Sequence, residues 1–231
     1  MNVKILMPEV NPKSFIDDYL YKMGIEYPQS YMNAGRSHLE EPNRYLNIDE
    51  ATHRLNQAIR NGERVGIIQD CDVDGVCSAV IAYQFLESNG MEPIVFFHTG
   101  KQHGINDLML QIINANLDLL IVPDAGSSDV DACRELRANG VDVIIADHHE
   151  IENENQFAIV VNCMQGDTNH AASGTTVMTK IIDRYGERYL GGRRFNFEDL
   201  VALSLLSDSR SMLSIENRAY LNLGFGGNKH E

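Results

Sequence analysis

The feature that most constrains the fold of this chain is a regular alternation of short apolar runs with stretches of helical periodicity. Strands buried on both faces of a parallel sheet appear as continuous Val, Ile and Leu runs, and the helices between them provide the crossovers. The alternation therefore predicts a doubly wound α/β fold, with a mainly parallel five-stranded sheet and helices on both faces. The predicted strands are residues 65–68, 94–97, 119–122, 141–146 and 159–161, and the predicted helices are 76–88, 105–114, 130–138 and 174–185.

Two segments precede the alternating region. Residues 1–45 contain scattered Pro, Gly, Tyr and Asn with short apolar runs, which predicts an irregular or partly helical arm. Residues 47–61 place apolar side chains on one helical face and are followed by Gly62, a common helix stop. At 231 residues the chain is long enough for one main domain, which we place at residues 46–231.

Composition excludes several classes of protein. No stretch approaches the roughly 18 uncharged apolar residues that span a bilayer, so we do not expect a membrane protein. The N-terminus lacks the features of a secretory signal, which favours a cytoplasmic location. The net charge of −14 argues against a broad basic surface for duplex DNA. The four cysteines form no CxxC pair and are predicted to be small buried hydrophobic residues.

Acidic residues and histidines follow three of the predicted strands. Asp70, Asp72 and Asp74 follow the first strand in DCDVDG, Asp124 follows the third, and DHH at 147–149 follows the fourth. The carboxyl ends of parallel strands meet at one edge of a sheet, where ligands bind. Carboxylate oxygens mixed with imidazole suit Mn²⁺ or Mg²⁺, and a cation would relieve the repulsion among the carboxylates.

A calcium loop is the main structural alternative for DCDVDG. An EF-hand requires a Glu at position 12, and counting from Asp70 that position is Ile81, within an apolar helix. Taken alone, Asp147 could also cap a helix, and His148 could bond a buried carbonyl group. The three acidic strand ends together favour a metal site.

The order of four motifs resembles that of the DHH phosphoesterases, in particular the RecJ-type single-strand exonucleases. The motifs are DCDVDG, PDAGSSD, VIIADHHE and LVALSLLSDSRSMLSIENR, and the similarity runs from His38 to the end of the chain. The resemblance implies two divalent cations, Mn²⁺ or Mg²⁺, held by Asp72, Asp74, Asp124, His148 and Asp208. It makes Asp124 the candidate for the bridging ligand.

The resemblance gives other residues less definite roles. Asp70 is implied to be a ligand or a carboxylate that orients one. His149 is implied to lie near the scissile phosphate, where it could stabilise negative charge, or to be a structural histidine. The remaining candidates for phosphate contacts are His98, Lys101, His103, Ser173, Gly174 and Arg218. For these the alternatives are a solvated loop at 98–103, a plain N-cap at Ser173 and an ion pair at Arg218.

The implied activity is two-metal hydrolysis of phosphodiester bonds, with 5′-to-3′ degradation of single-stranded DNA as the first expectation. DHH relatives also act on short oligonucleotides and cyclic dinucleotides, and a scaffold without activity in a replication or repair complex is a further alternative. RecJ-type proteins continue into a second domain and an OB-fold that hold the strand. This chain stops after GFGGNKHE, and we expect that substrate-gripping part to be absent from it.

Overall fold

The computed structural model describes residues 14–98, 100 and 103–226, and its centre is a five-stranded parallel sheet. The strand order is β2-β1-β3-β4-β5, and every neighbouring pair is parallel. The strands are β1 (Val65–Gln69), β2 (Ile94–Phe97), β3 (Leu119–Pro123), β4 (Asp142–Asp147) and β5 (Ile159–Asn162). The predicted fold class is confirmed.

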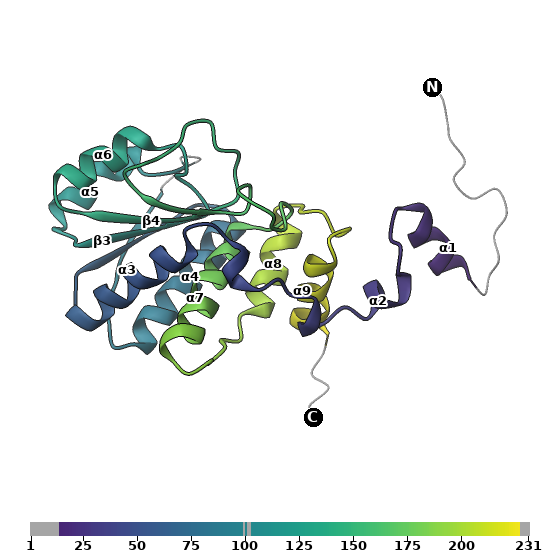
Figure 1. The fold of residues 1–231 in the computed structure, drawn as a ribbon. Helices are drawn as coiled ribbons and strands as arrows, with labels where there is room; N and C mark the ends of the chain where they lie inside the picture. The colour runs from purple at the N-terminus through teal and green to yellow at the C-terminus, as the bar shows by residue number, and fades with distance from the viewer. Residues whose placement is uncertain (1–13, 99, 101–102, 227–231) are drawn as a thin grey trace, which may run out of the picture.

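Helices cover both faces of the sheet (Figure 1). One face packs against α3 (Ile48–Asn61), α4 (Val73–Ser88) and α7 (Gly174–Tyr189). The other face packs against α5 (Met109–Asn114), preceded by the 3-10 turn η3 (Asn106–Leu108), and α6 (Val130–Ala138). Successive strand residues point to opposite faces, so Ile67 belongs to the first core and Ile68 to the second.

The helices α8 (Glu198–Ser207) and α9 (Ile215–Phe225) form a pair beside the sheet and pack on each other through Val201, Leu205 and Tyr220. Helix α8 also contacts α4, which brings its C-terminal end towards the carboxyl edge of the sheet. Across the described residues, the helices are too short or too polar to cross a bilayer.

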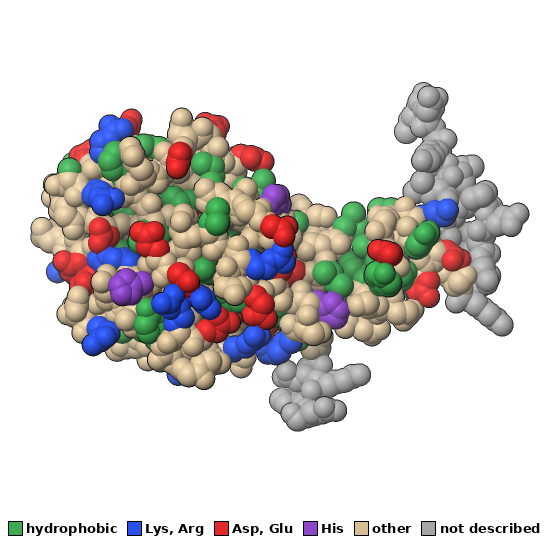
Figure 2. Space-filling model, viewed as in Figure 1, with side chains coloured by type: hydrophobic (Ala, Val, Ile, Leu, Met, Phe, Trp, Pro, Cys, Tyr) green, Lys and Arg blue, Asp and Glu red, His purple; other side chains and the backbone are tan. Residues whose placement is uncertain are grey.

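The described part of the N-terminal arm contains α1 (Phe15–Lys22), α2 (Pro28–Met32) and the 3-10 turns η1 (Arg36–His38) and η2 (Pro42–Arg44). It projects from the domain at α9, and α1 buries none of its residues (Figure 1). Figure 2 shows hydrophobic side chains on this projection, in agreement with the exposure of Phe15, Tyr19 and Tyr27. Residues 1–13 of the predicted arm lie outside the described residues.

Two local predictions from the sequence are corrected by the structure. The helix predicted at 76–88 begins three residues earlier, at Val73, so Gly75 lies within the first turn of α4. A Cβ at Gly75 would lie 2.9 Å from the Cα of Asp70, which explains the glycine as a packing requirement. Cys71 is exposed, whereas the other three cysteines are buried as predicted, because Cys71 lies in the loop between β1 and α4.

A buried ion pair joins the arm to α7 and α9. The Nζ of Lys180 lies 2.6 Å from Oε1 of Glu216, and both side chains are about 2% exposed. Lys180 also donates to the carbonyl oxygen of Glu40, and Glu216 accepts from the backbone N–H of Glu40 and the amide of Asn169. Glu216 of the ENR motif is therefore a structural residue that fixes the loop entering α7.

Replacing Glu216 with alanine is expected to lower the free energy of unfolding by about 3–5 kcal/mol, because it leaves the Lys180 ammonium buried without its partner. Denaturant unfolding of the purified variant measures this loss. The control is Glu187→Ala, whose carboxylate pairs with Arg184 near the surface and whose loss should cost less than about 1 kcal/mol. Equal losses for the two variants would contradict the structural role of Glu216.

Candidate metal centre

The predicted site residues gather at the carboxyl edge of the sheet. Asp70 and Asp124 directly follow β1 and β3, and Asp147 is the last residue of β4. The backbone N–H of Asp124 donates to the carbonyl oxygen of Ala146 at 2.8 Å, so the ends of β3 and β4 are held together. Asp124 has a φ of +66°, a left-handed conformation that is uncommon for a residue with a side chain.

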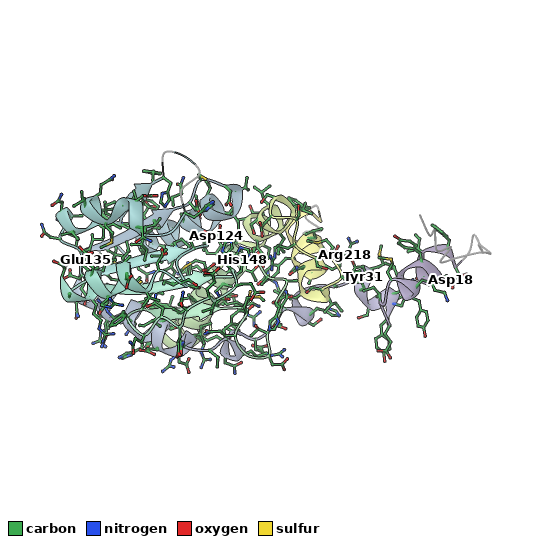
Figure 3. The ribbon with its side chains drawn as sticks, turned by 90° about the horizontal axis from the view of Figure 1, so that it is seen from above. Asp18, Tyr31, Asp124, Glu135, His148 and Arg218 are labelled. Atoms are coloured by element: carbon green, nitrogen blue, oxygen red, sulfur yellow. The ribbon has the colours of Figure 1, made fainter. Side chains whose placement is uncertain are left out.

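His148 is the centre of the cluster. Its Nε2 lies 3.1 Å from Oδ1 of Asp124, 3.7 Å from Oδ2 of Asp74 and 3.8 Å from Oδ2 of Asp208. His148 and Asp124 directly follow β4 and β3, Asp74 lies in α4, and Asp208 is the C-cap of α8. Figure 3 shows Asp124 and His148 close together. Burial lowers the pKa of His148, which favours the neutral imidazole that binds metals.

Two groups of donor atoms in this cluster are close enough to hold a cation. One consists of Asp124, His148 and His149, and the other of Asp74, His148 and Asp208. Within the described part of the chain, Oδ1 of Asp124 and Oδ2 of Asp208 are buried without a hydrogen-bond partner, and both lie within 4 Å of Nε2 of His148. Buried polar atoms are nearly always paired, so their convergence fits a cation held by oxygen and imidazole ligands.

The electrostatics of Asp124 support the same conclusion. Burial and the nearby charges of Asp74 and Asp72 raise the pKa of its carboxyl group to about 11. A carboxylate in this position is strongly disfavoured unless a positive charge compensates it. Gly174 packs directly on Asp124, because a Cβ there would lie 2.7 Å from the aspartate Cα. This packing thus holds Asp124 in place within one of the two donor groups.

Asp74 is fixed by the N-terminus of α7. Its two carboxylate oxygens accept hydrogen bonds from the backbone N–H groups of Gly174 and Thr175 at 2.8 and 2.9 Å, and Thr175 Oγ1 also donates to it. The expectation that Gly174 and Ser173 receive a phosphate is therefore corrected, because Asp74 already occupies this helix N-terminus. Ser173 is a fully buried N-cap that accepts from Thr176 and bonds Ser204.

Asp147 orients the second histidine of the DHH motif. Its carboxylate lies 2.8 Å from Nδ1 of His149 and also accepts from the backbone N–H groups of Ser127, His148 and His149. Burial opposes ionisation of Asp147, but these hydrogen bonds prevail and hold its pKa at about 2. The hydrogen bond that Nδ1 of His149 donates to Asp147 in turn raises the pKa of His149. With Nδ1 engaged, His149 presents Nε2 to the site.

The first two aspartates of DCDVDG make other contacts. Asp72 is the N-cap of α4 and accepts from the N–H of Gly75 at 2.8 Å, which leaves its other oxygen unused by that bond. Asp70 is buried and lies 2.5 Å from Nδ1 of His103 through one oxygen. Its other oxygen accepts from the N–H of Cys71. Asp70 therefore has the contacts of a carboxylate that orients another residue, whereas Asp72 retains one oxygen with which it can bind a cation.

The remaining candidates for phosphate contacts lie in different places. The Nε2 of His98 lies 2.9 Å from the carbonyl oxygen of Gly104 and so stabilises its own loop. Arg218, for which a phosphate contact and an ion pair were the two alternatives, lies over the ring of Tyr31 at the base of the arm, apart from Asp124 and His148 in Figure 3. Lys101 lies outside the described residues.

Sequence reasoning missed the role of one residue and the presence of another. It placed Asp147 in the DHH motif at a strand end, with a helix cap as the alternative, but gave it no part in positioning His149, although Asp147 carries most of the hydrogen bonds that do so. Asn162, at the end of β5, is fully buried and donates to Oγ of Ser127 and to the carbonyl oxygen of His149. Asn162 follows an apolar run without any motif, so only the pairing of β4 with β5 reveals its position.

Comparisons with known proteins agree with this geometry. Residues 64–205 match the model of the DHH family, N-terminal domain. The chain is 30% identical over 215 residues, 91% of its length, to YorK of the Bacillus subtilis SPbeta prophage, whose name gives single-strand DNA-specific exonuclease as a provisional activity. It is 27% identical over 165 residues, 70% of its length, to the single-stranded-DNA-specific exonuclease RecJ of Thermus thermophilus.

Solved structures show the same likeness. A crystal structure of exonuclease RecJ bound to manganese matches 79% of this chain and 48% of that chain, with a TM-score of 0.72 and 26% identity. RecJ of Thermus thermophilus in complex with Mn²⁺ matches 94% of this chain and 31% of that chain, with a TM-score of 0.78 and 24% identity. This chain spans only 37% of YorK and 25% of the Thermus RecJ sequence.

Proposed function

Because the chain belongs to the DHH family, we propose that it is a metal-dependent hydrolase that degrades single-stranded DNA in the 5′-to-3′ direction. The observation that carries the proposal is the convergence of Asp74, Asp124 and Asp208 on Nε2 of His148, with one buried carboxylate oxygen of Asp124 and one of Asp208 lacking a hydrogen-bond partner. The activity printed in the names of its relatives supports the substrate. The same proposal gives the protein a cytoplasmic role in DNA repair or recombination.

The ligands in this proposal are Asp72, Asp74, Asp124, His148 and Asp208, with Asp70 as an orienting carboxylate. Their oxygen and imidazole donors fit two Mn²⁺ or Mg²⁺ ions, the cations present in solved RecJ structures. His149 joins Asp124 and His148 in one of the two donor groups, and we assign it to the substrate phosphate beside the ions, not to a cation. When bound, a pair of such cations activates water and neutralises the charge that develops on a phosphate.

In this mechanism, contacts within the protein orient the metal ligands and the histidine that contacts the phosphate. The α7 N-terminus fixes Asp74, and the contact with Gly174 fixes Asp124, so the ligands are positioned before substrate arrives. His149, held by Asp147, is the group best placed to donate a hydrogen bond to a phosphate oxygen as negative charge develops. No described cysteine or serine is required as a nucleophile, so we expect hydrolysis without a covalent enzyme intermediate.

The test is cleavage of single-stranded DNA and RNA oligonucleotides labelled at the 5′ or the 3′ end, with Mn²⁺ and with EDTA. We expect metal-dependent release of mononucleotides from the 5′ end of DNA. Release from the 3′ end would overturn the direction, and preferential loss of RNA would overturn the substrate. Cleavage of cyclic dinucleotides alone would reassign the substrate class, and inactivity towards all of these would favour a scaffold.

A further inference from the structure

A cavity of about 410 Å³ opens beside the candidate metal centre. Asp147 and His149 form one part of its lining, and His103 and Gly104 form another. The loop that follows β3, from Ala125 to Asp129, lines it as well. Its volume lies in the range of small-molecule sites, about 300–1,000 Å³. A nucleotide whose phosphate lies at the metal centre therefore has this cavity next to it.

Two histidines that line the cavity are each held by a hydrogen bond to a buried carboxylate. His103 is bonded through Nδ1 to Asp70 at 2.5 Å, and His149 is bonded through Nδ1 to Asp147 at 2.8 Å. Both carboxylates are about 1% exposed, whereas both imidazoles are more than half exposed. A buried carboxylate behind an exposed ring fixes the orientation of that ring without covering it.

The strand order places these rings on different sides of the cavity. His103 follows β2 and His149 follows β4, and β1 and β3 lie between these two strands in the sheet. The loop carrying His103 is anchored by Asp129, whose carboxylate accepts from the N–H of Ile105 at 2.8 Å and from the amide of Asn106. His103 is thus attached to the loop after β3 as well as to Asp70.

The shape of the cavity depends on small residues. Gly104 and Gly126 have φ values of +78° and +96°, in the region that favours glycine. A Cβ on Gly104 would collide with the Asp129 carboxylate, and one on Gly126 would lie 3.2 Å from Val122. With Ala125 and Ser127 beside them, these positions keep long side chains out of the space between the rings.

The charge of the lining argues against a phosphate as the occupant. Asp129, Glu150 and Glu152 contribute carboxylates, and the described residues that line the cavity include neither Lys nor Arg. A second phosphate would be repelled by these carboxylates. A neutral, flat group is compatible with them, and imidazole rings are among the side chains on which nucleobases stack.

We propose that this cavity binds the base and sugar of the terminal nucleotide of the substrate, and that His103, held by Asp70, is the residue on which the base stacks. This inference rests on the proposed function, since it assumes a nucleotide phosphate at the metal centre. It gives His103 a contact with the base instead of the phosphate contact expected from the sequence. Recognition through stacking accepts every base, as a nuclease that degrades mixed sequences requires.

The test compares ligands that share a phosphate and differ in the base. The scissile phosphate of a 5′-to-3′ exonuclease is joined to the 3′ oxygen of the terminal nucleotide, so the ligands carry a 3′ phosphate. Isothermal titration calorimetry in the presence of Mn²⁺ would measure binding of dAMP in its 3′-phosphate form, of 2-deoxyribose 3-phosphate and of inorganic phosphate to the full chain. Stacking on an aromatic side chain should make this dAMP bind roughly tenfold more tightly than 2-deoxyribose 3-phosphate. His103→Ala should abolish this difference, and His103→Phe, which retains a ring, should restore most of it.

The control is His53→Ala, because His53 is an exposed histidine on α3 whose ring bonds Tyr189, outside the cavity lining. This variant should keep the preference for dAMP. Equal binding of this dAMP and 2-deoxyribose 3-phosphate to the unmodified protein would overturn the inference, as would an unchanged preference in His103→Ala. Circular dichroism and denaturant unfolding confirm that each variant is folded.

A second readout separates this inference from the proposed function. On single-stranded DNA with an abasic terminal nucleotide, the unmodified protein should show a KM raised roughly tenfold with kcat little changed, whereas His103→Ala should show the same KM for both substrates. Absence of metal-dependent cleavage would refute the proposed function, but the calorimetric preference for a base would still test the cavity. Normal cleavage without any base preference would refute only the inference.

Discussion

The variant Asp124→Asn is expected to degrade single-stranded DNA at least about 10³-fold more slowly than the unmodified protein, because a metal ion supplies several kcal/mol of transition-state stabilisation. Asparagine has nearly the same shape but lacks the charge that a bridging ligand provides. The measurement is the initial rate of mononucleotide release at saturating Mn²⁺. The control is Asp131→Asn on α6, whose carboxylate is largely exposed and pairs only with Arg134 in the described part of the chain.

Although it slows degradation, the same substitution should raise the thermal stability of the protein in EDTA. Burial and neighbouring charges raise the pKa of Asp124 to about 11, so without a cation this carboxyl group destabilises the folded state increasingly as pH rises above its unfolded value of about 4. Asp124→Asn removes that destabilisation. In EDTA at pH 7 the variant should melt at a higher temperature than the unmodified protein.

Added Mn²⁺ should reverse that order. The cation stabilises the unmodified protein by binding its folded state, whereas Asp124→Asn lacks one of the charges that hold it. Thermal melting with and without Mn²⁺ therefore tests the site independently of nuclease activity. A variant that gains as much stability from Mn²⁺ as the unmodified protein does would show that Asp124 is not a ligand.

The central sheet was predictable because each strand is a short, almost purely apolar run. The structure extends β1, β3 and β5 by one residue each, to Gln69, Pro123 and Asn162, where polar residues and proline end the hydrophobic signal. The helices were less well delimited. Helix α7 continues to Tyr189 beyond the predicted end at residue 185, because the polar residues of its last turn gave no periodic signal.

The site was predictable to the extent that it follows the strand ends. The convergence of Asp124 with His148 is a direct consequence of adjacent parallel strands, which place β3 and β4 residues side by side. Asp208 belongs to a separate helix pair, and only the resemblance to a family indicated it. The contact of Asp74 with the α7 N-terminus was hidden because it joins residues that are 100 positions apart.

The phosphate contacts were the weakest part of the sequence analysis, and the reason is physical. A serine and a glycine at a helix start have the same pattern whether the free N–H groups bind a substrate or a carboxylate of the protein. In this fold Asp74 takes that place, and the phosphate-binding role proposed for His149 depends on a carboxylate that precedes it by two residues. Sequence patterns show which residues carry charge, but not which partners already neutralise them.

Replacing Asp147 with asparagine is expected to slow DNA degradation by roughly 10–100-fold while Mn²⁺ binding is kept, because the substitution disturbs the orientation of His149 and removes no proposed ligand. The pKa of Asp147 is held at about 2, so its carboxylate contributes about 2 kcal/mol of stability above its unfolded pKa of about 4, and this is lost as pH falls towards 2. In EDTA, the stability difference between the unmodified protein and Asp147→Asn should therefore shrink by about 1 kcal/mol from pH 5 to pH 3 in denaturant unfolding. Asp142→Asn, at the exposed start of the same strand, is the matched control and should retain the rate. A difference that stays constant between the two pH values would show that the hydrogen bonds to Asp147 do not depress its pKa.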